Sequence, residues 1–264
     1  MHAITLDQGI MLTIMSIIVG IDFWLESLYI FRPIIVCTLT GIILGDLQTG
    51  LLAGSLTELA FAGLTPAGGT QPPNPVLAGV MTVVIAYTTG VEPQAAIGLA
   101  LPFSILMQYI ILFYYSTFSL FMGKADAYAA AADTGAFWKL NLLMTAIVAV
   151  TYGIVVFLSA YVAQDAMQAL VMAMPDWLKH GFEIAGGILP AVGFGMLLTV
   201  MLKMQYVPYL IIGFVAASFI QFANLLPVAL LGTAIAIYEY YNAKQWKQAK
   251  VENNAQGSDN SEGI

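Results

Sequence analysis

The chain has 264 residues, of which 60% are apolar and 9% are charged, whereas soluble domains average roughly 25% charged residues. This composition predicts an integral membrane protein, and a net charge of −7 with only eight basic residues excludes the basic surface that nucleic-acid binding requires. One cysteine and two widely separated histidines exclude a disulfide framework and give no metal-binding spacing, so we expect no metal and no cofactor.

Short apolar segments make up the first 90 residues. Each is only 12 or 13 residues long, against about 20 for a helix that spans a bilayer. Polar residues, glycines and prolines separate them. The N-terminal third is therefore predicted to hold re-entrant, discontinuous helical segments, which transporters bury in protein or use to line a wet cavity. The segments are 9–21, 33–44, 51–62 and 76–88.

Charged residues gather after the first of these segments, in IDFWLESLYIFRP. Asp22 and Glu26 share a helix face and repel each other unless a cation is near, and Arg32 is the nearest candidate. The surrounding aromatic residues are typical of a membrane interface, which we favour over a ligand site. Asp22 stays a possible secondary contact.

Two GxxxG spacings follow, Gly41 with Gly45 and Gly50 with Gly54. Such pairs allow helices to approach closely, so packing is the expected role of all four glycines, within the chain or against another subunit. Asp46 lies between the pairs at an expected helix boundary. Its interpretation as a helix cap ranks ahead of ligand contact.

Glu58 is the leading functional candidate, because a carboxylate inside an apolar segment is costly. A carboxylate can accept hydrogen bonds from two sugar hydroxyls at once, which suits a neutral polyol. The alternative is a protonated side chain, or one bonded to a neighbouring helix for purely structural reasons.

The stretch TPAGGTQPPNP, residues 65–75, combines hydroxyl and amide groups with prolines that leave backbone groups free. By itself this composition also describes a solvent-exposed loop. The flanking apolar segments are too short to carry it out of the bilayer, so a re-entrant tip is favoured.

The rest of the chain predicts three full spans and a divided segment. Pro208, Asn224 and Pro227 cut 207–242 into two pieces, either a hairpin of spans or partly re-entrant segments. Met167, Leu170, Val171 and Met174 have helical spacing, which predicts an interfacial helix over 164–181. Glu183 follows that helix, and helix-start charge and ligand contact are equally compatible with it. The three spans are 94–122, 139–163 and 182–202.

Lysine placement predicts the orientation, because cytoplasmic loops are enriched in Lys and Arg. One side of the membrane receives Lys124, Lys139 and Lys203, and the three lysines of the tail join them if 207–242 is a complete hairpin, whereas Lys179 alone lies opposite. We therefore expect a membrane domain over 1–242 and a flexible, polar, cytoplasmic tail over 243–264. Neither His2, expected at a frayed end, nor His180 or Cys37 has a partner suited to chemistry.

The segment FRPIIVCTLTGIILGDLQTGLLAGSLTELAFAGLTPAGGTQPPNP, followed later by GFEIAGGILPAVGFGMLL, resembles the C-component of mannose/sorbose-type enzyme II of the bacterial sugar phosphotransferase system. The similarity covers nearly the whole chain. The stretches FWLES, TELAFAGLTPAGG and QPPNP are most similar to C-components of N-acetylgalactosamine or galactosamine permeases.

The resemblance implies an all-α, polytopic sugar-translocating subunit in the bacterial inner membrane, whose core domain moves against a scaffold. It implies a membrane D-component as partner, in C/D complexes that form homo-oligomers. Cytoplasmic A- and B-components are implied to relay phosphate from phosphoenolpyruvate, so the phosphoryl-transfer residues are expected on partner subunits.

Carried over by position, the family's intramembrane carboxylate falls on Glu58, and its polar re-entrant region falls on Thr70, Gln71 and Asn74. Mannose-type relatives have an acidic residue where Asn74 stands. The main alternative function is an ion-coupled secondary transporter with Glu58 as the coupling carboxylate. A structural membrane subunit that touches no ligand is a third possibility.

Overall fold

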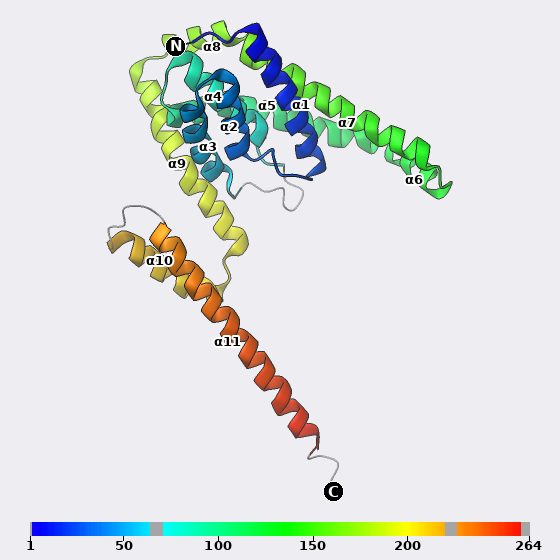
Figure 1. Ribbon diagram of the computed structural model, residues 1–264, viewed down its shortest axis with the longest axis vertical. Coiled ribbons are helices and arrows are strands. Elements are labelled where there is room, and N and C mark those ends of the chain that lie inside the picture. The colour runs from blue at the N-terminus through cyan, green and yellow to red at the C-terminus, as the bar shows by residue number, and fades with distance from the viewer. Residues whose placement is uncertain (1, 64–70, 220–225, 260–264) are drawn as a thin grey trace. The chain divides into compact units, whose positions relative to one another are not determined.

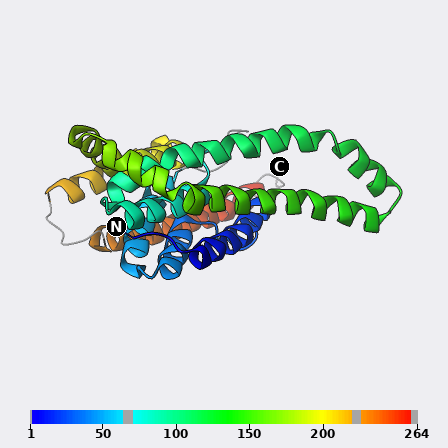
Figure 2. The same cartoon turned by 90° about the horizontal axis from the view of Figure 1, so that it is seen from above.

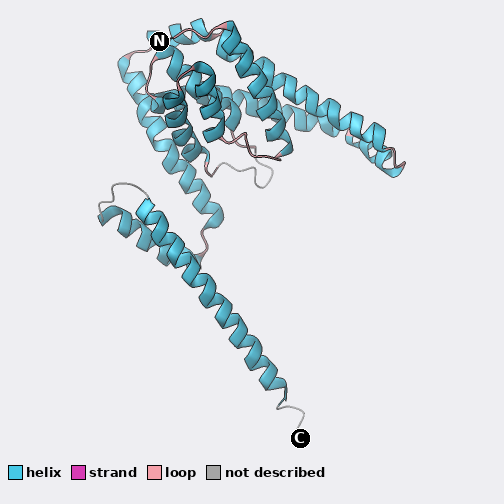
Figure 3. Ribbon diagram, in the orientation of Figure 1, coloured by secondary structure: helices cyan, strands magenta, loops and turns pink. Residues whose placement is uncertain are grey.

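The computed structural model describes residues 2–63, 71–219 and 226–259, apart from the side chains of Val200 and of 246–259. Every regular element in these ranges is helical (Figure 3). The chain divides into two compact units, Met1–Val200 and Met201–Ile264. The first unit holds α1 (Leu6–Leu25), α2 (Pro33–Leu44), α3 (Leu47–Phe61), α4 (Pro75–Thr89), α5 (Pro93–Ser119), α6 (Met122–Ala130), α7 (Thr134–Val156), the π-helical turn η1 (Phe157–Val162), α8 (Gln164–Ala173) and α9 (Asp176–Met201).

Among the described residues, four helices are long and apolar enough to cross a membrane: α1, α5, α7 with η1, and α9. The last three confirm the spans predicted from the sequence. Helix α1 corrects the expectation that the segment 9–21 is too short to cross. Its 20 residues begin at a capping box formed by Thr5 and Gln8, which extends the helix beyond the apolar run.

Helix α1 packs along α7 with one face, and the described residues leave its opposite face exposed (Figure 1). Ile10, Ile14 and Ile18 repeat every fourth residue on the uncovered face, as a surface that contacts lipid or another subunit requires. On the packed face, Gly20 lies beneath the ring of Tyr152. A Cβ at Gly20 would come within 2.5 Å of that ring.

Helices α2 and α3 form a tight hairpin. A Cβ on Gly41 would lie 2.7 Å from the Cα of Gly50, so both positions need glycine for this crossing. Gly54 likewise packs against Ile34 and Cys37. Gly45 differs from the expected packing role: with a φ of 80° it ends α2 in the left-handed conformation.

Helix α4 is the centre of the first unit. Of its 15 residues, 13 are buried, and α2, α3, α5 and α8 surround it. Its side chains are mostly apolar on every face, and its buried threonines bond to carbonyls of the same helix, so α4 is a core helix without a solvent-facing side. Helices α2, α3 and α4 have 12, 15 and 15 residues, so the prediction of short segments in this region is confirmed.

Helices α5 and α7 form a long hairpin, joined by α6, that extends away from the short helices (Figures 1 and 2). Helix α6 has no buried residue. The interfacial helix expected over 164–181 is shorter, because α8 ends at Ala173. Met174, which precedes Pro175, takes the extended conformation that a following proline imposes, and α9 then begins. Met167, Val171 and Met174 pack against the core of the chain, whereas Leu170 is exposed.

In the second unit, the described residues form a short 3₁₀ turn, η2 (Met204–Tyr206), and two helices, α10 (Val207–Phe219) and α11 (Leu226–Asp259). Two separate pieces confirm the expected division of 207–242. Helix α11 also includes residues 243–259, so this part of the tail is helical. Alanine, lysine, glutamine and glutamate, all good helix formers, account for that. The flexibility of the tail stays a prediction.

Candidate functional site

Three of the polar residues that the sequence singled out, Thr70, Gln71 and Asn74, belong to the junction between α3 and α4, and Glu58 lies near the end of α3. Asn74 caps α4: its Oδ1 accepts a hydrogen bond of 3.0 Å from the Leu77 backbone, and Pro75 occupies the first helical position. Both are standard helix-start features. Residues 64–70, including Thr70, lie outside the described residues.

Asn74 also ties this junction to two spanning helices. Its backbone N–H donates to the carbonyl of Ser104 on α5 at 3.1 Å, and the Ser104 hydroxyl donates to the Asn74 carbonyl at 2.8 Å. Its Nδ2 donates to the Tyr152 hydroxyl on α7 at 2.6 Å. The residue is fully buried, and its side chain has both an acceptor and a donor engaged. In this conformation Asn74 positions the start of α4 instead of facing a cavity.

These contacts fix the depth of the junction along the spans. Ser104 lies near the middle of α5, so α4 begins about halfway along a helix long enough to cross the bilayer. With 15 residues, α4 is about 22 Å long, shorter than the roughly 30 Å hydrocarbon core. A short helix that begins at this depth has the geometry of a re-entrant segment.

Gln71 lies three residues before Asn74, and only some of its polar atoms have hydrogen-bond partners among the described residues. Its backbone carbonyl accepts a hydrogen bond from Gln108 Nε2, and its Oε1 lies 3.5 Å from the Tyr115 hydroxyl. Its Nε2 is buried and has no hydrogen-bond partner within the described part of the chain. Gln71 is 8% exposed. The Tyr115 ring in turn stacks on Trp24 at the end of α1.

Glu58 is paired with Arg32. The guanidinium donates through Nε at 2.7 Å and through Nη2 to Glu58 Oε1, and Oε2 accepts from the Ile34 backbone at 3.2 Å. The pair is partly buried, with side-chain exposures of 32% for Arg32 and 25% for Glu58. It joins the start of α2 to the end of α3. Within the described residues no hydrogen bond links Glu58 to Gln71 or Asn74.

Asp22 is buried and uses its carboxylate locally. It accepts hydrogen bonds from the backbone N–H groups of Leu28 at 2.6 Å and Ile30 at 2.7 Å. These bonds hold the loop between α1 and α2. Arg32, the cation that the sequence suggested for Asp22 and Glu26, instead pairs with Glu58. Backbone donors supply the compensation that Asp22 needs.

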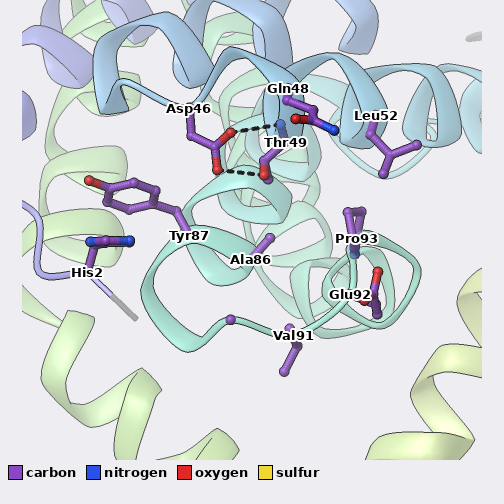
Figure 4. A pocket seen from close by; sticks show the side chains of 11 residues that line it. His2, Asp46, Gln48, Thr49, Leu52, Ala86, Tyr87, Val91, Glu92 and Pro93 are labelled. Carbon is purple, nitrogen blue, oxygen red and sulfur yellow. Dashed lines mark hydrogen bonds between the residues drawn. The ribbon is translucent and has the colours of Figure 1, made fainter.

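A polar cavity of about 380 Å³ lies elsewhere in the first unit, where the α2–α3 and α4–α5 turns meet the N-terminal segment (Figure 4). Asp46 accepts from the Thr49 hydroxyl at 2.6 Å and from its backbone at 3.0 Å, which confirms the helix-cap interpretation. These two bonds hold the pKa of the Asp46 carboxylate below its usual value. The sequence expectation that His2 is frayed is wrong: its ring stacks on Tyr87 at 5.0 Å.

Glu183, the last of the secondary candidates, lies on the exposed surface of α9. His180 Nδ1 approaches its Oε2 at 3.2 Å, and both side chains are at least half exposed. This is a local pair on one helix. The described residues contain no cluster of three or more His, Cys, Asp or Glu side chains that could hold a metal ion.

The described residues of the junction and the neighbouring residues of α5 and α7 offer amide and hydroxyl groups and tyrosine rings about halfway along the spans. The Glu58 carboxylate lies separately, near the end of α3. Such groups recognise a neutral, hydroxyl-rich solute by hydrogen bonding, with stacking from the rings. Sequence reasoning missed Ser104, Gln108 and Tyr115 of α5. The signal was present, because Ser104 and Gln108 are polar residues four positions apart inside an apolar span and therefore share one face.

The family model described as "PTS system sorbose-specific iic component" matches residues 6–238. Among curated proteins, the chain is 66% identical to N-acetylgalactosamine permease IIC component 1 of Escherichia coli (strain K12), over 95% of this chain and 94% of that protein. It is 30% identical to the sorbose-specific EIIC component of the phosphotransferase system from Klebsiella pneumoniae, over 92% and 91% of the two chains.

Solved structures give the same picture. A chain described as "Structure of membrane protein" superposes with a TM-score of 0.81 at 27% identity, covering 90% of this chain and 96% of its own length. A chain from the cryoEM structure of mannose transporter ManYZ in complex with Microcin E492 gives a TM-score of 0.57, also at 27% identity. This superposition covers 91% of this chain and 97% of the transporter chain.

Proposed function

We propose, from the premise that this chain belongs to the family of phosphotransferase-system sorbose-specific IIC components, that it binds and translocates N-acetylgalactosamine or galactosamine. As a family member it is a sugar transport subunit and a multi-pass membrane protein. The observation that carries the choice of sugar is the high identity, along almost the whole chain, to a relative named for N-acetylgalactosamine.

The proposed partners are a membrane D-component and a phosphorylated cytoplasmic B-component, with an A-component upstream. The mannose transporter relative, whose described name joins two components, supports assembly with other membrane subunits. We propose that C/D complexes associate further into homo-oligomers. The proposed location is the bacterial inner membrane, as the family implies, and the lysines of the α5–α7 connection and of the tail favour a cytoplasmic C-terminus.

The proposed sugar site is the α3–α4 junction, with Glu58, Thr70, Gln71 and Asn74 as its residues. The contacts described above suggest a division of labour. Asn74 holds the start of α4 against α5 and α7, and Gln71 Nε2, which has no hydrogen-bond partner among the described residues, is available to bind. Glu58 retains acceptor capacity beyond its bonds to Arg32 and Ile34, because a carboxylate offers about four lone-pair sites. Asp22, Asp46 and Glu183 serve structure.

In the proposed cycle, the core accepts the sugar from outside and moves to expose it to the phosphorylated B-component. Phosphorylation adds a charge of about −2. The sequence holds no lysine or arginine between positions 33 and 123, and Arg32, the cation beside Glu58, is already engaged in an ion pair with it, so a sugar phosphate meets no unpaired cation among the described residues of this site. Return of the product through this site is therefore unfavourable. The phosphoryl-transfer residues belong to the partners, and this chain supplies binding and movement.

The ion-coupled alternative has less support. A coupling carboxylate must gain and lose a proton or sodium ion during transport, whereas the negative charge of Glu58 is already compensated by Arg32. An uncoupler distinguishes the two functions. It abolishes ion-coupled uptake directly, but leaves phosphorylation driven by phosphoenolpyruvate in permeabilised cells intact.

The test is a comparison of sugars in cells that retain the D-, B- and A-components and lack their own C-component. We expect this chain to restore uptake and phosphoenolpyruvate-dependent phosphorylation of N-acetylgalactosamine or galactosamine, and not of mannose or sorbose. Glu58→Gln and Glu58→Ala test the site in the same cells. Uptake equal to wild type in both variants would remove Glu58 from the site, and failure with both amino sugars would refute the proposed function.

A further inference from the structure

The side chain of Gln71 combines two properties that conflict in an apolar setting. Gln71 is only 8% exposed, and its Nε2 has no hydrogen-bond partner among the described residues. Leaving a buried donor unpaired costs about 1–3 kcal/mol. Native proteins seldom keep such groups, and those they keep call for an explanation such as a missing ligand.

The backbone of Gln71 is held firmly, and a 180° rotation of its side-chain amide would only exchange Nε2 and Oε1, so that the oxygen would lose its bond from Tyr115. Its backbone carbonyl accepts from Gln108, and the next helix is fixed to α5 through Asn74 and Ser104. Its Oε1 faces the Tyr115 hydroxyl. The amide is thus oriented with its oxygen toward Tyr115 and its two N–H groups elsewhere.

Aromatic rings lie next to this amide. Tyr115 is half exposed and stacks on Trp24 with ring centroids 5.5 Å apart, and Trp24 also meets Phe118 edge-on at 5.8 Å. Aromatic faces next to hydrogen-bonding groups suit a ligand that has both a polar edge and an apolar part. An acetamido group has this character, with one carbonyl acceptor and one methyl group.

We propose that the Gln71 side-chain amide determines specificity, by donating a hydrogen bond from Nε2 to the carbonyl oxygen of an N-acyl group on the sugar. This inference rests on the proposed function and goes further, because it selects between N-acetylgalactosamine and galactosamine. An ammonium group offers only donors and cannot pair with Nε2. The N-acylated sugar is therefore the better ligand.

The burial of Nε2 is compatible with this role in a transporter. A carrier that alternates between two sides of a membrane encloses its substrate at a site near the bilayer midplane. The start of α4 lies at that depth, beside the middle of α5. The donor is then satisfied in the sugar-bound state and unpaired in the sugar-free one, which favours binding of a ligand that carries the matching acceptor.

Two substitutions in the full chain, together with its D-, B- and A-components, test the proposal. Gln71→Met keeps the size and removes the donor, and Gln71→Glu replaces the N–H groups with an oxygen that can accept from an ammonium. Gln48→Glu makes the same chemical change at an exposed position of α3 and is the matched control. The measurements are initial uptake of each sugar below saturation and the amount of each variant in the membrane.

We expect Gln71→Met to lower uptake of N-acetylgalactosamine about tenfold, the effect of losing one hydrogen bond of about 1.4 kcal/mol, and to change galactosamine uptake less than about twofold. Gln71→Glu shifts the ratio of the two rates toward galactosamine. Gln48→Glu leaves both rates within about twofold of wild type.

Equal losses for both sugars, or unchanged rates in both Gln71 variants, would overturn the inference. So would the absence of both variants from the membrane, since Gln71 would then serve folding. A wild-type chain that transports neither sugar refutes the proposed function instead, and that result is visible before any variant is compared.

Discussion

Replacing Glu58 with glutamine removes the negative partner of Arg32 while leaving the shape of the α2–α3 contact unchanged. Breaking a fully buried ion pair costs 3–5 kcal/mol, and exposed pairs contribute about 0–1 kcal/mol. The two side chains are 25% and 32% exposed, so this pair lies between those limits. We expect a loss of about 2 kcal/mol, which for a chain of this size lowers Tm by about 4–8 °C.

The assay is thermal unfolding of the full chain with its D-component in detergent, arranged as a double-mutant cycle. The variants are Glu58→Gln, Arg32→Gln and the double substitution. Because both single changes break one interaction, the double variant is expected to lose less than the sum of the two. Purely additive losses, or Tm values within about 1 °C of wild type for both single variants, would refute a stabilising pair.

Three further predictions follow from named contacts. Gly41→Ala places a Cβ 2.7 Å from the Cα of Gly50 and should destabilise the same complex by about 1–3 kcal/mol, whereas Gly123→Ala, with open space around it, serves as the control with no loss. Asp46 has a pKa lowered by its bonds from the neighbouring threonine, so the stability that its charge provides is present above the unfolded value of 3.8 and is lost as pH falls through the folded pKa. Asp46→Asn removes this charge, so Tm of the variant should fall less steeply than that of wild type as the pH drops below 3.8. The same dependence of Tm on pH in both proteins would contradict a stabilising role of the Asp46 charge. Asn74→Ala should lower the free energy of unfolding by about 2–4 kcal/mol, because it leaves the start of α4 and a buried tyrosine hydroxyl unpaired. Asn74→Asp should lower it less, because aspartate keeps the cap acceptor. Equal losses in the two variants would count against the capping role.

Much of the helix layout could be predicted from the sequence, because hydrophobic length is a local property. Helix α2 begins and ends where its apolar run does, at 33 and 44. Helix α1 was missed because polar residues near both of its ends conceal its length. Thr5 and Gln8 cap its start, and Asp22 lies inside its last turn, where loop N–H groups make a buried carboxylate acceptable.

The candidate site was harder to predict, because its roles depend on contacts between distant residues. Arg32 and Glu58 are 26 positions apart, and Asn74 and Tyr152 are 78 apart. No local pattern pairs them. Asn74 directly before Pro75 is a helix-start signal that the sequence does carry, and it correctly indicates the cap that the structure contains.

The sequence could not predict that Gln71 Nε2 is buried without a hydrogen-bond acceptor among the described residues. This property depends on tertiary packing, which the arrangement of α4 against α5 reveals. The polar face of α5 was readable in principle, since Ser104 and Gln108 interrupt an apolar span at helical spacing. The residues that this face of α5 contacts could not be predicted from the sequence.

The most direct measurement of the central claim is a structure of this chain with its D-component and bound N-acetylgalactosamine. The account predicts density for the sugar at the α3–α4 junction, with its acetamido oxygen within about 3.2 Å of Gln71 Nε2. Sugar bound instead in the cavity that Asp46 and His2 line, or remote from the start of α4, would contradict it.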